Sequence, residues 1–348
     1  KKTIMQVFEE IQIFLSQQKT FVCYVKPNEK VWNLLVQQND EIIEFSNQAG
    51  FVFMPFHEGK QVVIPFEGNS FSQGNLEKLE QKSSENFISE TNQKETFENL
   101  VAKGVSAIKL GEFDKVVLSR KIILKEQISI VETFQNLISS YPTAFRYLFF
   151  HPKIGLWMGA TPEQLVKINQ NQFETVALAG TQLYSENVIW ATKEIEEQQF
   201  VTDYIVAKVK DKVTKLIISD AKTVKAGNLA HLKSSISGEL TADFQANDLI
   251  KTLHPTPAVC GLPKENAIDF ILKNEGYNRK YYAGFLGEYN KDNQTDLFVN
   301  LRCLEVENDV VNIYVGCGIT KDSNPEKEFI ETENKSMTMR NVLVKSKK

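Results

Sequence analysis

Short runs of β-branched and aromatic residues recur through the first part of the chain, and Pro and Gly separate them. Runs of this kind at residues 20–25, 51–56 and 61–66 have the length and composition of β-strands. From residue 68 to residue 94 the composition changes to Ser, Asn, Gln, Glu and Lys, with few apolar positions. A polar stretch of this length is typical of a solvated connection or a surface helix, so we expect a boundary between two lobes within it.

The middle of the chain alternates between helical and strand-like patterns. These patterns predict helices at residues 96–110 and 130–139 and strands at residues 115–124, 145–150 and 154–158. The clearest helical pattern lies at residues 191–217, where apolar residues recur at spacings of three, four and six. We expect them to form one apolar stripe on a long helix: Ile195, Val201, Ile205, Val209, Val213 and Leu216.

The last part of the chain predicts a second group of strands between two helices. Pro263 suits a first helical position, so we expect a helix from there to about residue 273. Three strand-like runs follow at residues 281–289, 297–306 and 310–319, and short polar links join them. Links this short force consecutive strands to be antiparallel neighbours. A final helix is predicted from Pro325 to about residue 344.

The length of 348 residues exceeds the ~250–300 at which a single hydrophobic core usually stops growing. We therefore predict one two-lobed domain, in which residues 1–94 form an N-terminal lobe that contributes strands to the sheets and residues 95–348 form the larger region. The 44 acidic and 40 basic side chains are interspersed and leave a formal charge of −4. Because no basic stripe is present to neutralise phosphates, nucleic acid is not an expected partner.

No apolar run approaches the ~20 residues that a membrane-spanning helix needs, and the chain does not open with a secretory signal. We therefore expect no membrane partner and a cytoplasmic location. The four cysteines lack CxxC spacing, and most lie in apolar segments, so buried, reduced thiols are expected at Cys23, Cys260, Cys303 and Cys317. The sequence leaves the oligomeric state open, with a monomer favoured.

Two predicted helices each carry a pair of glutamates three residues apart. The pairs are Glu194 with Glu197 and Glu328 with Glu331, and residues at this spacing lie on one face of a helix. Two such faces could together bind a hard cation such as Mg²⁺, which prefers oxygen ligands. Acidic pairs on helices are more often solvated surface. Lys335 shares the face of the second pair, where it could form a surface ion pair or contact a ligand.

Four further positions raise the question of an anionic ligand. Arg302 lies in an otherwise apolar strand-like run, and a buried guanidinium needs an anionic partner, which could be a protein carboxylate or a substrate carboxylate. Gly316 and Gly318 end a predicted strand just before a helix, where bare backbone can approach a ligand or simply form a turn. Lys115 heads its strand, a position at which exposed lysines are also common.

Taken in order, ten segments between about residue 95 and residue 345 resemble the chorismate-utilising enzymes, and among these they are most similar to the isochorismate synthases. The segments are Phe113-Asp-Lys-Val-Val-Leu-Ser-Arg120, Gly159-Ala-Thr-Pro-Glu163, Leu178-Ala-Gly-Thr181, Lys193-Glu-Ile-Glu-Glu197, His231-Leu-Lys-Ser234, His254-Pro-Thr-Pro-Ala-Val-Cys-Gly261, Tyr282-Ala-Gly284, Asn300-Leu-Arg-Cys303, Gly316-Cys-Gly-Ile319 and Glu328-Phe-Ile-Glu-Thr-Glu-Asn-Lys335. The first ninety residues match only loosely.

This resemblance implies an α/β (α+β) fold of the anthranilate-synthase large-subunit type. In that fold two large, mainly antiparallel sheets face each other, helices lie outside, and the site lies between the sheets. The resemblance further implies chorismate as the substrate, Mg²⁺ as the cofactor and an isomerase that adds water at C2 while the C4 hydroxyl leaves. Lys115 would then be the general base and Glu163 the general acid, and Glu163 should have a raised pKa in order to stay protonated.

The resemblance assigns binding roles to the remaining positions. Glu197 and Glu331 would bind the Mg²⁺ ion, and Glu194 and Glu328 would bind it directly or through water. The side-chain carboxylate of the substrate would be held by Tyr282, Arg302, Gly316, Gly318 and Lys335. The ring would be lined by Gly180, Thr181 and His231. The segment between Glu163 and Glu197 is about ten residues shorter than is usual in the family, which casts doubt on peripheral loop contacts.

Two positions bear on the nucleophile within the family. Relatives that add ammonia lack a lysine at the position of Lys115, and aminodeoxychorismate synthases carry a nucleophilic lysine where this chain has Ala179. Water is therefore the expected nucleophile, and isochorismate for menaquinone biosynthesis the expected product. The alternatives are isochorismate for a siderophore, a salicylate synthase that also eliminates pyruvate, and a catalytically silent chorismate-binding subunit.

Overall fold

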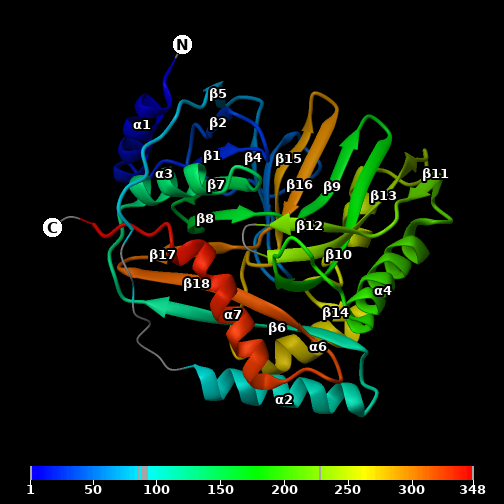
Figure 1. Cartoon of the computed structure of the whole chain (residues 1–348). Coiled ribbons are helices and arrows are strands. Elements are labelled where there is room, and N and C mark those ends of the chain that lie inside the picture. Colours follow the sequence, from blue (N-terminus) through cyan, green and yellow to red (C-terminus); the bar gives the residue numbers. More distant parts are fainter. Residues whose placement is uncertain (1, 85–86, 88–92, 227–228, 347–348) are drawn as a thin grey trace.

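The computed structural model describes residues 2–84, 87, 93–226 and 229–346, which fold into two large antiparallel sheets (Figure 1). The first sheet has the order β14 (Gly261–Leu262), β6 (Lys115–Leu124), β18 (Val310–Ile319), β17 (Cys303–Glu307), β8 (Gly155–Thr161), β7 (Phe145–His151), β1 (Phe21–Val25), β2 (Val31–Val36) and β5 (Ser70–Asn75). The second has the order β11 (Val213–Ile218), β13 (Leu229–Leu240), β10 (Gln172–Leu183), β9 (Gln164–Asn169), β16 (Gln294–Val299), β15 (Phe285–Lys291), β3 (Gly50–Met54) and β4 (Val62–Pro65). A further strand, β12 (Lys222–Ala226), pairs with β13.

Aromatic side chains pack the two sheets face to face. Phe53 of β3 stacks on Phe149 of β7 with ring centroids 4.2 Å apart, and Phe145 of β7 stacks on Phe298 of β16 at 4.4 Å. All four side chains are buried. Since each pair joins one sheet to the other, burial of large apolar surface fixes the distance and register between the sheets. The predicted α/β class with two facing, mainly antiparallel sheets is confirmed.

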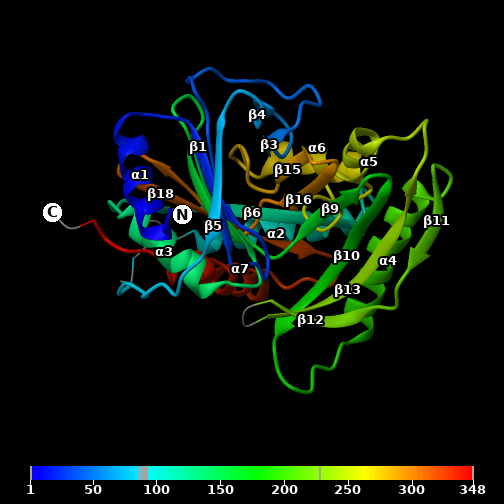
Figure 2. The same ribbon diagram turned by 90° about the horizontal axis from the view of Figure 1, so that it is seen from above.

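Helices cover the outer faces of this sandwich (Figure 2). The helix α4 contacts β10 and β13 of the second sheet, whereas α2 and α7 contact β18 of the first. The helices are α1 (Ile4–Ser16), α2 (Lys94–Lys109), α3 (Ile130–Ser140), α4 (Thr192–Val209), α5 (Ala246–Leu253), α6 (Lys264–Asn274) and α7 (Pro325–Arg340). No helix of the described chain is long and apolar enough to cross a bilayer.

Several local predictions are confirmed by element bounds. The strand at residues 115–124 is β6, and the helices expected at residues 96–110 and 130–139 are α2 and α3. The helix expected from Pro263 is α6, which begins one residue later at Lys264 with Pro263 as its N-cap, and the helix expected from Pro325 is α7. The Asn324 side chain accepts a hydrogen bond from the Lys327 amide and caps α7. All four cysteines are free and buried, as expected.

The long helix predicted at residues 191–217 is confirmed to Val209 and wrong beyond it. Helix α4 ends at Val209, and Val213 begins strand β11, which pairs with β13. A spacing of four residues, as between Val209 and Val213, fits one face of a strand as well as one face of a helix, so the stripe could not show where the helix stops. Pairing with β13 decides the conformation of residues 213–218. At the other end of the stripe, Ile195 is 52% exposed.

The polar stretch at residues 68–94 is also not merely a solvated connection. Residues 70–75 form β5, which pairs with β2 at the edge of the first sheet. Helix α1 and strand β2 were not predicted either. Strands from the first 94 residues enter both sheets, because β1, β2 and β5 belong to the first and β3 and β4 to the second. The boundary between two lobes stays a prediction.

The single strand predicted at residues 297–306 is in fact two strands in different sheets. The chain leaves the second sheet after Val299 and enters the first at Cys303, and Arg302 between them has a φ of +48°. Arg302 therefore lies between two strands, and not within one as the sequence predicts. A second crossing, from β8 to β9, runs beside it. The Thr161 hydroxyl donates a hydrogen bond to the Val299 carbonyl, and the Val299 amide donates one to the Glu163 carbonyl, so the two crossings are joined. The Glu163 amide donates to the Thr161 hydroxyl within its own crossing.

We call the two crossings, at residues 162–163 and 300–302, the seam between the sheets. Asn300 lies in this seam and is fully buried. Its Oδ1 accepts a hydrogen bond of 2.6 Å from the Tyr147 hydroxyl of the first sheet, and its Nδ2 donates one of 3.0 Å to the Tyr281 carbonyl, which precedes β15 of the second. Its backbone exchanges hydrogen bonds with Ala283 and Gly284. Every polar group of Asn300 is therefore used to tie the two sheets together.

Replacement of Asn300 by Ala should destabilise the protein strongly. The change leaves the Tyr147 hydroxyl and the Tyr281 carbonyl buried without partners, which costs about 3 kcal/mol or more in the free energy of unfolding. Urea denaturation followed by circular dichroism measures this loss. Asn171→Ala in an exposed turn is the matched control and should change the free energy by less than about 0.5 kcal/mol. Equal stability of the two variants would contradict the role of Asn300.

Candidate active site

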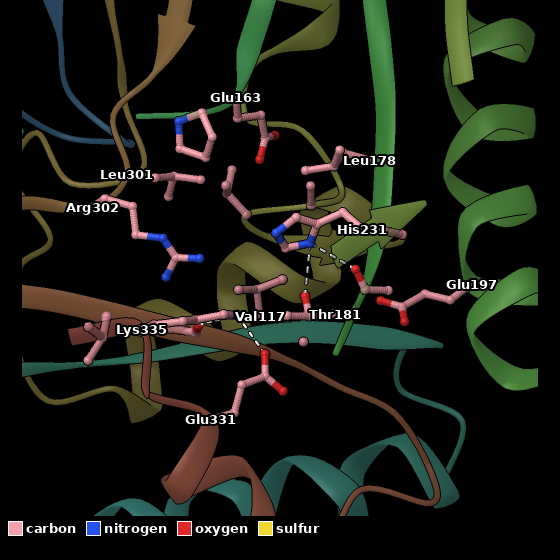
Figure 3. A pocket seen from close by; sticks show the side chains of 18 of the residues that line it. Val117, Glu163, Leu178, Thr181, Glu197, His231, Leu301, Arg302, Glu331 and Lys335 are labelled. Carbon is pink, nitrogen blue, oxygen red and sulfur yellow. Dashed lines mark hydrogen bonds and ion pairs between the residues drawn. The ribbon is translucent and has the colours of Figure 1, made fainter. Parts of the chain in front are cut away.

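All fourteen candidate site residues from the sequence line one cavity between the sheets, with a volume of about 170 Å³ (Figure 3). Strands β6 and β18 of the first sheet form one wall, β10 and β13 of the second form another, and α4 and α7 close the ends. The residues are Lys115, Glu163, Gly180, Thr181, Glu194, Glu197, His231, Tyr282, Arg302, Gly316, Gly318, Glu328, Glu331 and Lys335. The structure thus brings all of them together, although they span more than 200 positions of sequence.

The two glycines of β18 make room for functional side chains. A Cβ at Gly318 would lie 3.1 Å from Cε of Lys115 and 3.4 Å from a carboxylate oxygen of Glu197. A Cβ at Gly316 would lie 2.7 Å from the Tyr282 hydroxyl. Strand β18 pairs with β6 in a register that places Gly318 opposite Val117, two residues after Lys115. The Lys115 side chain passes close to Gly318 and lines the cavity. Any side chain at these positions would displace the neighbouring group.

Two lysines are bound to glutamates of the two helices. Lys115 Nζ lies 2.6 Å from Glu197 of α4, and Lys335 Nζ lies 2.6 Å from Glu331 of α7. Lys335 also donates a hydrogen bond of 3.0 Å to the Gly316 carbonyl. The surface ion pair considered for Lys335 therefore exists, but it faces the cavity and only 14% of the lysine side chain is exposed.

Glu163 is a buried carboxyl whose pKa is raised to about 7 by burial. The positive charges of Lys115, Arg302 and Lys335 act in the opposite direction and hold the pKa below the value that burial alone would give. The pKa of Glu163 is thus shifted in the direction expected for a group that must stay protonated near neutrality. Its position at the crossing between β8 and β9 removes it from water.

His231 is neutral at physiological pH, because burial lowers its pKa to about 4. Its Nδ1 lies 2.9 Å from the Gly180 carbonyl and 3.2 Å from the Thr181 hydroxyl. A carbonyl can only accept, so Nδ1 carries the proton and Nε2 has a free lone pair. His231 can therefore accept a hydrogen bond from a hydroxyl group of a ligand through Nε2.

Arg302 forms no ion pair with any carboxylate of the described chain, which answers the question that its sequence position raised. Its guanidinium points into the cavity (Figure 3), and burial lowers its pKa below the usual range. A partly buried cation without a protein anion favours an anionic ligand. The structure therefore favours a substrate carboxylate as the partner of Arg302.

The donor set at the cavity suits a hard cation. Glu194 and Glu197 on α4 face Glu328 and Glu331 on α7 across the cavity, and Glu194 Oε2 is buried without a hydrogen-bond partner among the described residues. Buried carboxylate oxygens without donors are stabilised by a cation. As the side chains stand, no three acidic, histidine or cysteine groups of the described chain lie close enough to ligate one ion, and two of the four glutamates hold lysines instead.

Sequence reasoning missed other lining residues, most of them apolar. Tyr314 is the clearest of these, because it precedes Gly316 and Gly318 by steps of two on β18 and so lies on the same face of the strand. That period-two pattern could have identified it. The others carry no chemical signal in the sequence: Val117, Pro162, Leu178, Ala258, Val259, Leu301 and Val315.

The cavity is lined by lysines, glutamates and an arginine without a carboxylate partner in the described chain, and comparison with known sequences identifies the family. Residues 31–344 match the family described as chorismate binding enzyme, and the chain belongs to it. The resemblance noted in the sequence is thereby confirmed.

Individual relatives include both isochorismate synthases and anthranilate synthases. The chain is 27% identical over 260 residues to isochorismate synthase EntC of Escherichia coli K12, an alignment that covers 71% of this chain and 66% of EntC. It is 29% identical over 312 residues to isochorismate synthase DhbC of Bacillus subtilis, covering 82% and 78%. It is 28% identical over 277 residues to anthranilate synthase component 1 of Archaeoglobus fulgidus, covering 74% and 64%. The chain thus spans about two thirds of the length of several relatives.

Solved structures support the fold. The menaquinone-specific isochorismate synthase MenF of Escherichia coli superposes with a TM-score of 0.78 at 19% identity, over 93% of this chain and 88% of MenF. Anthranilate synthase component I of Streptococcus pneumoniae superposes with a TM-score of 0.69 at 18% identity, over 92% and 90%. At these identities the likeness concerns the arrangement of the sheets and helices and not the reaction.

Glu163→Gln should stabilise the protein at high pH. Folding raises the pKa of Glu163 from 4.5 to about 7. Between these pH values the folded protein keeps a proton that the unfolded chain has released. The free energy of unfolding therefore falls as the pH rises from about 4.5 to about 7. The neutral amide avoids this cost, so the variant should gain up to about 3 kcal/mol at pH 8 and little at pH 4.5.

Urea unfolding of wild type and variant at both pH values measures this difference. Glu174→Gln, at an exposed position of β10, is the control and should show no gain that depends on pH. A Glu163→Gln gain of the same size at pH 4.5 and pH 8 would mean that the carboxyl is not protonated in the folded protein.

Proposed function

We propose that this protein is an isochorismate synthase, an isomerase that converts chorismate to isochorismate with Mg²⁺ as cofactor. The observation that carries the proposal is the presence of a lysine and a carboxyl with a pKa near 7 around one cavity. Lys115 and Glu163 are chemically suited to opposite tasks, since one can accept a proton and the other can donate one. Binding of chorismate without turnover would require neither group.

Glu163 would act as the general acid. Its carboxyl is buried and holds its proton near neutrality, and proton transfer to the C4 hydroxyl of chorismate would let that hydroxyl leave as water. As a consequence the reaction should slow as the pH rises through about 7 and Glu163 ionises. The C4–O bond breaks, the ring double bonds shift, and a C2–O bond forms with one water. One water thus leaves and one is added.

Lys115 would remove the proton from the attacking water. Its ammonium group is held against Glu197 at 2.6 Å, which fixes the direction of the side chain beside Gly318. To act as a base the amine must first be neutral, so its contact with Glu197 has to change during the reaction cycle. Ala179, on β10 in the other sheet, also lines the cavity and offers no competing amine nucleophile, which supports water as the nucleophile.

The remaining polar groups would bind the substrate. Arg302 and Lys335 would hold its side-chain carboxylate together with the Tyr282 hydroxyl and the backbone at Gly316. His231, with its free Nε2, would accept a hydrogen bond from a hydroxyl on the ring. These contacts would orient C2 toward Lys115 and C4 toward Glu163, which lowers the entropic cost of the reaction.

The four glutamates of α4 and α7 would hold the Mg²⁺ ion. A bound Mg²⁺ would neutralise the ring carboxylate of the substrate and assist charge redistribution at the ring. The buried, unpaired Glu194 Oε2 supports this assignment from the side of the protein. Supply of isochorismate to menaquinone stays a prediction, with a siderophore or salicylate as the alternatives.

Chromatography of the products tests the proposal. Incubation with chorismate and Mg²⁺ should yield isochorismate, and Lys115→Ala and Glu163→Gln should fold normally but lose at least ~100-fold in rate, the usual scale of acid–base catalysis. Lys121→Ala, on the same strand but outside the cavity, is the control and should keep wild-type activity. Salicylate with pyruvate as lasting products would favour the salicylate synthase, and no turnover at saturating Mg²⁺ would favour a silent binding subunit.

Glu197→Ala and Glu331→Ala should each weaken Mg²⁺ binding to the substrate-free protein by about tenfold or more, because each removes a carboxylate from the proposed donor set. Isothermal titration with Mg²⁺ measures this effect. Glu326→Ala, at an exposed position in the first turn of α7, should leave the titration unchanged. A Mg²⁺ titration that is the same in all four proteins would contradict the metal assignment.

A further inference from the structure

Helix α7 supplies part of the active-site cavity, yet it has little apolar surface to hold it in place. Three of its side chains line the cavity, namely Glu328, Glu331 and Lys335. Of its residues, all of which the structure describes, three are buried, and two of these are polar: Thr332, Ser336 and Met339. A helix without a wide apolar stripe is not fixed by hydrophobic burial alone. Polar contacts must therefore hold α7 where it packs on β18 and against α2 (Figure 1).

The rotation of α7 about its own axis decides where its functional groups lie. Glu331 and Lys335 reach the cavity from this helix (Figure 3). The ends of such side chains lie roughly 5–6 Å from the helix axis, so a rotation of ~30° would displace them by ~3 Å. A displacement of this size breaks a hydrogen bond and misplaces a ligand of Mg²⁺, which demands near-ideal coordination. The binding groups of α7 thus depend on a contact that resists rotation.

Arg120 of β6 makes such a contact, because it binds three side chains on one flank of α7. Its Nε donates a hydrogen bond of 2.9 Å to the Thr332 hydroxyl, and its Nη2 forms an ion pair with Glu333. Its guanidinium lies over the Phe329 ring, 4.5 Å from the centroid. At 100° per residue this flank lies roughly 120° around the axis from the face that lines the cavity. Arg120 is 7% exposed, and a rotation of α7 would disturb all three contacts at once.

The position of Arg120 on its strand links this contact to the cavity on the other side of the sheet. Successive residues of a strand point to opposite faces. Lys115 and Val117 line the cavity, whereas Arg120 points to the outer helices, where its guanidinium also lies 5.8 Å from the centroid of Phe97 on α2. The strand that carries the proposed base therefore also holds the helix that carries the proposed metal ligands.

Further polar contacts hold α7 near its ends. In the first turn Glu326 pairs with Lys94 of α2 at 3.0 Å, and both side chains are exposed. In the last turn the Thr338 carbonyl accepts a hydrogen bond of 2.8 Å from the Tyr141 hydroxyl. Arg120 differs from these groups because it acts in the middle of the helix, on residues that adjoin Glu331 in sequence.

We propose that Arg120 is a positioning residue of the active site, which fixes the rotation of α7 and so directs Glu331 and Lys335 into the cavity. This inference rests on the proposed function for what those two groups bind, namely Mg²⁺ and a carboxylate. The hold of Arg120 on α7 concerns the chain alone. Arg120 does not line the cavity. Its removal should therefore leave Lys115 and Glu163, which belong to the sheets and their crossings, in place.

Arg120→Met tests this role, because it keeps the apolar stem of the side chain and removes its charge and its hydrogen-bond donors. We expect KM for chorismate and the Kd for Mg²⁺ of the substrate-free protein each to rise at least tenfold, and kcat at saturation to fall less than about threefold. Loss of stability alone would lower the amount of active protein and leave KM and Kd of the folded protein unchanged. Lys94→Met removes an exposed cation between the same two helices, so it is the control and should keep both constants within twofold.

The rotation of α7 can also be measured without substrate or metal. All four native cysteines are buried, so spin labels can be attached selectively to Ile330→Cys on α7 and Phe200→Cys on α4, both at exposed positions. Arg120→Met should shift or broaden the distance distribution between the labels in double electron–electron resonance, and Lys94→Met should leave it unchanged. Circular dichroism confirms that each variant is folded.

Thr332→Val keeps the proposal testable even where Arg120→Met does not fold. It removes only the hydroxyl that Nε of Arg120 binds and keeps the shape of the side chain. It should raise KM for chorismate and the Kd for Mg²⁺ in the same direction, by at least threefold.

The outcomes separate the positioning role from the function. An unchanged KM together with an unchanged Kd for Mg²⁺ in folded Arg120→Met or Thr332→Val, or a distance distribution equal to that of the parent protein in folded Arg120→Met, would overturn the role of Arg120. If wild-type protein fails to convert chorismate, the proposed function falls, and the label distances still decide whether Arg120 fixes α7.

Discussion

The seam at which the chain crosses twice between the two sheets is the constraint on which the rest of this structure depends. One crossing joins β8 to β9 and the other joins β16 to β17, and hydrogen bonds through Thr161, Glu163 and Val299 hold them side by side. Buried Asn300 ties the second crossing to both sheets. Because a crossing must leave the regular ladder, it can present side chains to the space between the sheets, and here it presents Glu163 and Arg302.

The electrostatics of the cavity follow from this placement. Glu163 is withdrawn from water, so its pKa rises to about 7 in spite of three nearby cations. Lys115 and Lys335, which enter from strand β6 and helix α7, are held by carboxylates of α4 and α7. Arg302 is left without a protein anion. The site thus contains a neutral acid, two lysines fixed by ion pairs and one unpaired cation, an arrangement that suits binding of an anion more than it suits stability of the fold.

Packing of the sheets is what allows such a site to exist. Stacked aromatic pairs such as Phe53 with Phe149 and Phe145 with Phe298 contribute large apolar burial on one side of the seam. On the other side the glycines of β18 leave space where side chains would otherwise meet.

The sequence by itself determined the residue types, their local faces and much of the chemistry. A spacing of three placed the glutamates of α4 and α7 on one face each, and short polar links identified antiparallel strands correctly. The tertiary structure alone decided that residues 297–306 divide between two sheets, that the helix from residue 192 stops at Val209, and that Arg302 lacks a protein partner. Local spacing encodes which face of an element a residue occupies, whereas burial, pKa and strand pairing depend on segments far away in the chain, which no local pattern contains.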